Sequence, residues 1–590
     1  MKKQTKLVAV LSTAALLAIG ASMTSFAATG WAEEDGTWVY YDRNGDKVTD
    51  KWAKSGNNWY YLDSNGEMAV DTLIEDGDNY YYVDVNGVMA ANQWVAIDNE
   101  DAGDDDEPDA HWYYFQANGK AIKNTTDKVA LKTINGKKYT FDDEGKMLYG
   151  WVSEDNEHQD NTDGEGFTDG LYYFGDENDG AMTTGWALLD ITYTDVDNDK
   201  YNGIAPAFTD DEDQSRWFYF QSNGKKVHSD NDEKVKEKTI NGKKYGFDNL
   251  GAMVAEWSAD IAEASKNNVD ITASKSDSAN KKAVTAKYTQ QWRYFNSVED
   301  GSKVSRGWFK VVSAEYLNDE KFNDDEDAWY YAKGNGDLYA GEFKTINGKK
   351  YAFRNDGRMV SGLKFILDYG NDIDGLSVKA DDDGTYPFDT EDDFLKNAPI
   401  YEAMGYKCYY FGSGEDGAMR TNKTNITIDG DNYNFFFEKS GSKKGAGETG
   451  IQDKKYYQSG MLLSAGSDEK YQVVKKQETT VTVDKVDKKA TTYTKIDDAT
   501  KFLEEMEKNK ATTDYKNVLK DAKEDDYINI GSVKKKAKDL KEAYTFKAGA
   551  NYRLVNTSGK VIEKSKSKDG NDYVYVTDNS GNILGIYVED

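Results

Sequence analysis

The sequence has few of the residues that usually carry disulfide, metal or nucleophile chemistry. Among 590 residues it holds one cysteine, three histidines and four prolines. A single cysteine, Cys408, excludes an internal disulfide framework and a thiolate zinc site. The histidines, His111, His158 and His228, have no His-x₃-His spacing, so a zinc amidase site is not expected. We therefore expect no catalytic residue, no metal site and no cofactor.

Two further absences concern the partners of the protein. Basic residues are outnumbered, because 74 Lys and Arg stand against 106 Asp and Glu, which gives a net charge of −32. A polyanion repels phosphate groups, so we expect no nucleic-acid partner. After the N-terminal region no stretch approaches the about 20 apolar residues that a bilayer-crossing helix needs. We therefore expect no membrane span.

The first 27 residues have the pattern of a secretory signal peptide. Lys2, Lys3 and Lys6 form a basic start, an apolar run follows over 7–20, and small residues in 25–27 precede a cut before Ala28. The apolar run is too short to anchor the chain in a membrane. We expect residues 1–27 to be removed and the mature protein to be secreted.

Two acidic segments resemble the beginning of a calcium loop. Carboxylates alternate over 195–199, but Lys200 and Pro206 stand where an EF-hand loop has Gly and Glu. The second segment, 104–107, is a plain acidic cluster. We interpret both as solvated loops, with weak binding of extracellular calcium as the alternative.

Aromatic residues are abundant, with 42 Tyr, 23 Phe and 13 Trp, and disordered chains lack such residues. They also recur at fixed intervals. The apolar residues Trp31, Trp52, Leu73 and Trp94 are spaced by 21 positions. Aromatic-rich triplets follow at 38–40, 59–61 and 80–82, and each leads into an Asn-Gly pair at 44–45, 65–66 or 86–87. Such periodicity predicts a repeat architecture.

The repeat unit has the composition of a β-hairpin. Aromatic runs favour strands, and Asn-Gly accepts the positive φ angles of a tight turn. A lone hairpin buries too little surface, so units must stack on one another. The sequence KTINGKKY recurs at 132–139, 238–245 and 344–351, and acidic insertions separate the two strands of later units, as at 100–111 and 153–170. We predict a mainly β fold, a β-hairpin solenoid of about 21-residue repeats with acidic loop insertions over 28–470.

The composition changes near residue 470. Residues 471–590 hold 22 Lys and 1 Arg against 21 Asp and Glu, and every Trp lies before residue 330. Periodicity predicts strands at 471–474 and 479–483 and a closing hairpin of 573–577 with 583–588. It predicts helices at 501–508, 515–523 and 533–543. We expect residues 471–590 to form a small C-terminal α+β domain.

The repeats resemble known cell-wall-binding sequences of Gram-positive bacteria. The Trp, aromatic triplet, Asn-Gly and Met of 51–68 resemble the repeat of choline-binding surface proteins. The TINGKKY-x-F-x₃-G-x-M pattern of 133–147 resembles the related repeat of glucan-binding proteins and clostridial toxin receptor-binding regions. The resemblance covers about 28–465. It implies a hairpin solenoid that holds its ligand between successive hairpins.

The resemblance also implies which residues form these sites. In the choline-binding branch, the first Trp and the strand Trp of one unit form a cage that an aromatic residue of the next unit closes. The implied cages are Trp31 and Trp38 closed by Trp59 or Tyr61, Trp52 and Trp59 closed by Tyr80 or Tyr82, and the pairs Trp94 with Trp112, Trp186 with Trp217, and Trp308 with Trp329.

Aromatic rings suit two classes of ligand. Their faces attract a quaternary ammonium such as choline, and they stack on sugar C–H groups. The alternative is that most rings only fill the core between hairpins. We expect a secreted, non-catalytic surface protein attached noncovalently to cell-wall teichoic acid choline or polysaccharide. The other hypotheses are a cell-wall hydrolase with an unrecognised catalytic domain in 471–590, and an adhesin for host or dietary glycans or a host protein.

Overall fold

The computed structural model describes residues 29–590 except 101, 103–106, 195–210, 232–233, 260–263, 265–283, 371–374, 380–387, 413, 484 and 548–550. The predicted signal peptide at 1–27 and the acidic stretches 104–106 and 195–199 lie outside the described residues. The chain divides into two compact units. The first holds the described residues up to 194 together with 211–227, and the second holds those from 228 to 590.

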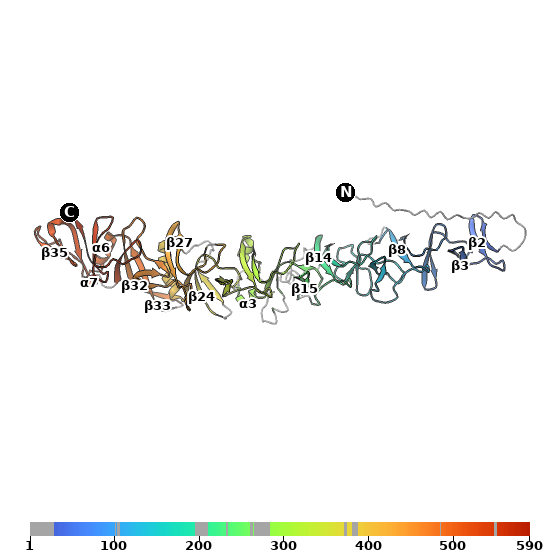
Figure 1. The fold of residues 1–590 in the computed structure, drawn as a ribbon, viewed down its shortest axis with the longest axis horizontal. Coiled ribbons are helices and arrows are strands. Elements are labelled where there is room, and N and C mark those ends of the chain that lie inside the picture. The colour runs from blue at the N-terminus through green and yellow to red at the C-terminus, as the bar shows by residue number, and fades with distance from the viewer. Residues whose placement is uncertain are drawn as a thin grey trace. The chain divides into compact units, whose positions relative to one another are not determined.

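Strands dominate both units, and the described helices are short (Figure 1). In the first unit successive strands pair as antiparallel hairpins. These strands are β1 (Gly30–Glu34), β2 (Thr37–Tyr41), β3 (Lys51–Ser55), β4 (Asn58–Leu62), β5 (Thr72–Asp76), β6 (Asn79–Val83), β7 (Gln93–Asp98), β8 (Ala110–Phe115), β9 (Lys132–Ile134), β10 (Lys137–Tyr139), β11 (Trp151–Val152), β12 (Tyr172–Tyr173), β13 (Gly185–Ile191) and β14 (Gln214–Phe220). The prediction of a mainly β fold is confirmed.

The second unit continues the pattern before it becomes more complex. Its early elements are β15 (Lys236–Ile240), β16 (Lys243–Phe247), β17 (Met253–Val254), β18 (Glu256–Ala259), α3 (Ala286–Thr289), β19 (Trp292–Phe295), β20 (Gly307–Val312), α4 (Asp319–Asn323), β21 (Asp327–Ala332), β22 (Glu342–Ile346) and β23 (Lys349–Phe353). The strands in this part of the unit pair as hairpins, and β17 adds a third strand to the hairpin β15–β16. The predicted insertions therefore do separate the two strands of a hairpin, as between β13 and β14.

The prediction that Asn-Gly forms the hairpin turn holds for only some of the units. The turn between β1 and β2 is Asp35–Gly36, with φ angles of 50° and 86°, as a type I′ turn requires. Asn-Gly forms the hairpin turn in the KTINGKKY copies, where Asn135 and Gly136 have φ angles of 50° and 85°. The pairs at 44–45, 65–66 and 86–87 instead follow the second strand of their hairpins.

These other Asn-Gly pairs lie in a tight loop that an aspartate organises. Asp63 Oδ1 accepts the backbone N–H of Asn65 at 2.9 Å and of Glu67 at 2.8 Å. The Gly66 N–H donates to the Asp63 carbonyl oxygen at 2.9 Å. Asp42, Asp84 and Asp142 begin equivalent loops. An Asx-type turn, in which the side chain mimics the backbone, therefore explains the Asp that precedes each of these glycines.

From the Asp63 loop onward, a backbone hydrogen bond links the loop that follows one hairpin to the hairpin of the preceding unit. The Met68 N–H donates to the Trp38 carbonyl oxygen at 2.7 Å, and the Met89 N–H donates to that of Trp59 at 2.9 Å. We call the donor residue the linking position, because it brings its side chain against the preceding hairpin. Among the described residues of the first unit, the linking positions are Met68, Met89, Ala121, Met147, Met182 and Lys226.

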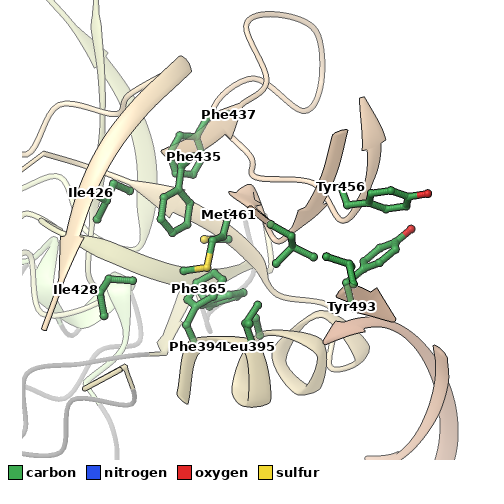
Figure 2. Packing of buried hydrophobic residues seen from close by; sticks show 14 of the residues in the cluster. Phe365, Phe394, Leu395, Ile426, Ile428, Phe435, Phe437, Tyr456, Met461 and Tyr493 are labelled. Carbon is green, nitrogen blue, oxygen red and sulfur yellow. The ribbon is translucent and has the colours of Figure 1, made fainter. Parts of the chain in front are cut away.

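The largest hydrophobic cluster lies in the second unit around α5 (Glu391–Ala403). Phe365 of β24 (Leu363–Asp368) and Phe394 of α5 pack with 6.1 Å between ring centroids, and Met461 lies beside them (Figure 2). The Thr390 side chain caps α5 by accepting the Asp393 N–H. The strands around this cluster are β25 (Leu376–Lys379), β26 (Lys407–Tyr410), β27 (Asn422–Ile428), β28 (Asp431–Phe437), β29 (Gly450–Gln452), β30 (Lys455–Gln458) and β31 (Met461–Leu462).

The same cluster contains residues from both sides of position 470. Val474, Tyr493, Val555 and Val561 are buried in it together with residues 365–463. Tyr456 and Tyr493 have ring centroids 5.3 Å apart across this position. The boundary between 470 and 471 stays a prediction, and the hydrophobic core is continuous across it.

The C-terminal region is built mainly of strands. They are β32 (Tyr471–Val483), β33 (Val486–Ile496), β34 (Lys516–Asn517), β35 (Tyr527–Ile530), β36 (Val533–Lys536), β37 (Leu540–Thr545), β38 (Tyr552–Asn556), β39 (Lys566–Lys568), β40 (Tyr573–Thr577) and β41 (Ile583–Glu589). The helices are α6 (Ala499–Lys508), α7 (Lys510–Thr513) and the 3₁₀ turn η1 (Ala537–Asp539). The predicted helix at 501–508 and the closing hairpin are confirmed.

The predicted helices at 515–523 and 533–543 are wrong. The second segment forms β36, η1 and the start of β37 instead. Val533, Leu540 and Ala543 are buried in one cluster with Val574 and Val576 of β40. Packing against this sheet outweighs the helix propensity of the intervening lysines and alanines, because propensity differences are only tenths of a kcal/mol per residue.

Candidate ligand sites between hairpins

The first site lies between hairpins β1–β2 and β3–β4. The register pairs Trp31 with Tyr40 and Glu33 with Trp38, so these four side chains share one face, which we call the front face of the hairpin. Tyr60 projects from the opposite face of the next hairpin. Its ring centroid lies 5.2 Å from that of Trp31. Two tryptophans of one hairpin and a tyrosine of the next thus line the first site.

The second site repeats this arrangement one unit later. Trp52 and Trp59 share the front face of β3–β4, and the Tyr81 ring centroid lies 5.0 Å from that of Trp52. The Trp52 Nε1–H donates to Asp76 Oδ2 at 3.1 Å, which fixes the orientation of the indole. Trp59 keeps 40% of its surface exposed. A ligand therefore has access to this ring.

The residues that touch the first Trp of each site differ from the predicted closing residues. The contacts reach Tyr60 and Tyr81, the middle residues of their triplets, and neither was among the predicted site residues. Tyr61, predicted to close the first site, instead lies 5.2 Å from Trp52 of its own hairpin. Strand alternation is the signal that identifies the middle residues, because it turns Tyr60 away from Trp59 and toward the preceding unit.

The third interface is a packed core. Here Leu73 stands at the position of the first Trp, and it packs with Tyr80 and Tyr82. The Tyr82 ring centroid lies 6.2 Å from that of the buried Phe115. The Tyr82 hydroxyl donates to the Asp71 carboxylate, and burial raises the pKa of Tyr82. Tyr80 and Tyr82 are thus partly buried and pack against the hydrophobic cluster of this interface.

Trp94 and Trp112 form the next site. They share the front face of hairpin β7–β8. Trp94 contacts Tyr139 and Phe141 of the following unit, at centroid distances of 4.9 and 5.8 Å. Met147 is buried beside these rings. This site keeps both tryptophans and adds a second closing ring.

The remaining predicted pairs are also brought together. Trp186 and Trp217 have ring centroids 6.2 Å apart and nearly perpendicular planes. Trp308 and Trp329 have almost the same relationship, at 6.3 Å and 87°. Tyr351 lies 4.8 Å from Trp308. The pairing of tryptophans across a long insertion, which the resemblance implied, is therefore present at these two pairs.

A polar pocket of about 410 Å³ adjoins Trp329. Glu415 accepts the Trp329 Nε1–H at 2.6 Å and lies 3.0 Å from the Lys310 ammonium. These contacts hold the pKa of Glu415 below its usual value. The charged residues that line the pocket are Lys310, Lys321, Arg354, Arg358, Glu320, Glu326, Asp327 and Glu415. Equal numbers of cationic and anionic groups beside an indole offer hydrogen bonds to a polar, uncharged ligand.

The charge beside the second Trp differs from site to site. The residue paired with it across the hairpin is Glu33 opposite Trp38, but Lys54 opposite Trp59. The Lys54 ammonium lies 5.6 Å from the centroid of the Trp59 ring. The corresponding residues at the other pairs are Ala96, Leu188 and Lys310. The first site therefore has an acidic neighbour where the second has a basic one.

Two other tryptophan interfaces are filled by the chain. Trp151 and Trp292, which were not predicted as site residues, are each only 1% exposed. Phe167, from the insertion between β11 and β12, packs against Phe218 beside Trp151. Tyr316, from the insertion between β20 and β21, stacks on Trp292 at 5.9 Å. Insertions thus supply the side chains that occupy these two interfaces.

The described residues contain no group of three or more His, Cys, Asp or Glu side chains arranged to hold a metal ion. No helix among the described residues is long and apolar enough to cross a membrane. Cys408 is buried in the largest hydrophobic cluster, and burial raises the pKa of its thiol.

Comparison with protein families identifies the repeats. The segments 28–72 and 48–94 match the choline-binding repeat, and residues 109–121 match the putative cell wall binding repeat. The choline-binding repeat match thus extends over residues 28–94. The first two ring-lined sites lie within the matched segments, and the repeats indicate binding to the cell wall or to carbohydrate.

Individual proteins are similar over longer parts of the chain. Glucosyltransferase-S of Streptococcus mutans is 30% identical over 366 residues, which is 58% of this chain but 22% of the length of that enzyme. Among solved structures, the modular autolysin LytC of Streptococcus pneumoniae is 17% identical with a TM-score of 0.29, over 58% of this chain and 55% of its own. Choline binding protein F of Streptococcus pneumoniae is 16% identical with a TM-score of 0.19, over 74% and 98% of the two chains.

Proposed function

We propose that this chain is a secreted, non-catalytic protein that attaches noncovalently to cell-wall polymers through the ring-lined sites between its hairpins. The observation that carries the proposal is the recurring set of two tryptophans and one tyrosine, as in Trp52, Trp59 and Tyr81. The partial exposure of Trp59 is compatible with it, because ring surface stays open to a ligand. The matched choline-binding repeats coincide with these residues.

Choline is the ligand that we assign to the first two sites. A quaternary ammonium is attracted to the faces of aromatic rings by about 0.5–2 kcal/mol per ring. The negative charge of the whole chain attracts a cation, and Glu33 adds a carboxylate next to Trp38. We expect the first site to bind choline more tightly than the second, where Lys54 repels a cation.

We also propose that the hairpins form a solenoid with a repeat of about 21 residues. The linking hydrogen bonds support this, since the bonds from Met68 and Met89 to the preceding hairpins are equivalent and 21 positions apart. The front face of each hairpin packs on the back of the next at Trp31–Tyr60 and again at Trp52–Tyr81.

Attachment is tested with purified cell walls that carry choline on their teichoic acid. The full chain is expected to sediment with these walls and to be released by free choline. The double substitution Trp38→Ala and Trp59→Ala is expected to weaken retention, whereas Val85→Ala, at a residue 70% exposed and outside the sites, serves as the matched control. The choline assignment would be overturned if free choline did not release the chain and if the double variant were retained as well as the Val85→Ala control.

The pocket beside Trp329 favours carbohydrate as a second ligand class. Its balanced charges supply donors and acceptors for hydroxyl groups, and the indole supplies an apolar face. The similarity to a glucosyltransferase extends over 58% of the chain. Soluble α-glucan is expected to compete for retention that survives choline, and Trp329→Ala is expected to remove that component. An adhesin that recognises host or dietary glycans would use the same chemistry.

The absence of catalysis is part of the proposal and has its own test. A zymogram that contains peptidoglycan detects hydrolysis as a clear zone. We expect none from the full chain or from residues 471–590. A clear zone from either sample would establish a hydrolase instead.

A further inference from the structure

Lys226 stands at a linking position that methionine occupies in four of the six cases in the first unit. Its backbone N–H donates to the Leu171 carbonyl oxygen at 2.8 Å. Met68, Met89 and Met147 make the same bond to the second strand of their preceding hairpins. The side chain of Lys226 therefore enters the interface between hairpins β11–β12 and β13–β14.

This interface has the architecture of the ligand sites. Trp151 is the first Trp of its hairpin, and Phe218 from the back face of the next hairpin lies 5.2 Å from it. Leu171 stands where other units have the second Trp. Phe167, from the insertion 153–170, is fully buried and packs on Phe218. The insertion thus supplies the third aromatic wall.

The ammonium of Lys226 lies within these walls. Lys226 is only 5% exposed, and its Nζ lies 5.4 Å from the centroid of the Trp151 ring. The same Nζ donates a hydrogen bond to the Phe167 carbonyl oxygen. Burial of an ammonium is costly unless its charge is compensated. Here the face of an indole and a carbonyl oxygen supply that compensation.

A second lysine stands at a linking position, and its ammonium has different neighbours. Lys303 donates its backbone N–H to the Lys244 carbonyl oxygen at 2.7 Å. This bond links it back to hairpin β15–β16, a KTINGKKY hairpin that has no Trp. Its ammonium forms an ion pair with Glu237 and donates to the Asn335 carbonyl oxygen at 2.9 Å. Lys303 is therefore held by a carboxylate and a carbonyl oxygen.

We propose that the β11–β14 interface is a cation-binding aromatic site whose ligand is the chain's own Lys226 ammonium. The bound ammonium ties the insertion 153–170 to the hairpins and excludes external choline from this interface. Only the statement about choline rests on the proposed function. We call the contact of the Lys226 ammonium with Trp151 and Phe167 the internal contact. It does not depend on whether the other sites bind choline, glucan or nothing.

The internal contact is tested on the full chain by hydrogen–deuterium exchange read by mass spectrometry. Lys226→Met, which restores the usual linking residue, is expected to raise exchange in 161–170 at least tenfold. Lys226→Gln keeps a hydrogen-bond donor without the charge and is expected to behave like Lys226→Met. Lys132→Met, at an exposed residue of the first unit, is the control and is expected to leave exchange unchanged.

Unchanged exchange in Lys226→Met would overturn the internal contact, and restoration by Lys226→Gln would overturn the role of the charge. The choline statement has a separate readout, the number of sites found by calorimetry. Lys226→Ala combined with Phe167→Ala is expected to add one site to the native number, and Met68→Lys is expected to remove one. If choline binds nowhere, the proposed function fails while the exchange result still decides the internal contact. If native sites exist and neither variant changes their number, the exclusion of choline is wrong.

Discussion

Trp52 and Tyr81 belong to different hairpins, yet their ring centroids lie 5.0 Å apart. The contact joins the front face of one repeat to the back face of the next. It serves stability and recognition together, since the same rings fill the interface and present a face to a cation. The equivalent pair, Trp31 and Tyr60, shows that the relationship belongs to the repeat itself.

The first prediction concerns Tyr81. Replacement by Ala removes one aromatic wall of the second site, and a ring contributes about 0.5–2 kcal/mol to cation binding. Calorimetric titration of Tyr81→Ala with choline is expected to show one site weakened by about 2- to 30-fold. Tyr82→Ala is the control, because Tyr82 packs in the core on Phe115. It is expected to lower the unfolding temperature and leave choline affinity unchanged. An unaltered titration of Tyr81→Ala would contradict the assignment of this ring.

The second prediction concerns the charges opposite the second tryptophans. Lys54→Ala is expected to raise choline affinity at the second site, and Glu33→Ala is expected to lower it at the first. Both residues are exposed, so each change should be about two- to fivefold in dissociation constant. The difference should shrink at 1 M salt, where the screening length is about 3 Å. If the choline affinity changes in the same direction in both variants, it does not depend on the local charge.

The sequence predicts the hairpins well because their signals are local. Trp52 and the triplet 59–61 have the composition of strands, and the structure pairs them in β3–β4. The position of the hairpin turn could not be read from Asn-Gly alone, for a physical reason. The same dipeptide serves the hairpin turn at 135–136 and the Asx-type loop at 65–66, and only the aspartate two residues earlier separates the two cases.

The site was predicted less completely than the fold. The five tryptophan pairs were implied by the resemblance to choline-binding repeats, but Tyr60 and Tyr81 require the stacking direction of the hairpins, which no single unit contains. Phe167 had no sequence signal, because an insertion has no periodicity to mark a buried ring. Leu540 and Ala543 were assigned to a helix because their partners, such as Val574, lie more than thirty residues away.

The third prediction concerns the region around position 470. Val474, Tyr493 and Val555 are buried in the same cluster as Phe365 and Phe394. Ending the chain at 470 therefore exposes apolar surface on residues 365–463. The truncated chain is expected to bind a hydrophobic dye and to lose exchange protection in 391–403, which is α5. Residues 30–115 should keep native protection and serve as the internal control. Native protection of α5 in the truncated chain would show that the core does not need the C-terminal region.

The last prediction concerns Asp142, whose carboxylate organises the loop after β10. Its Oδ1 accepts the backbone N–H groups of Glu144 at 3.0 Å and Lys146 at 2.7 Å. Burial raises the pKa of Asp142 to about 6. The backbone hydrogen bonds and the Lys146 charge oppose this shift without cancelling it. An Asp in the unfolded chain has a pKa of about 3.9.

The folded state therefore holds a proton that the unfolded state has released between about pH 4 and pH 6. Its free energy of unfolding falls as the pH rises through this window and is flat for this group above it. Asp142→Asn keeps the accepting oxygen and cannot titrate. Denaturant titrations followed by exchange protection of residues 110–150 at pH 4 and pH 7 give the stability of native and variant chains. The free energy of unfolding of the native chain, relative to that of the variant, is expected to fall by about 2 kcal/mol from pH 4 to pH 7. A difference that is constant with pH would show that Asp142 titrates alike in the folded and unfolded states, and a difference that grows with pH would show that its pKa is lowered by folding.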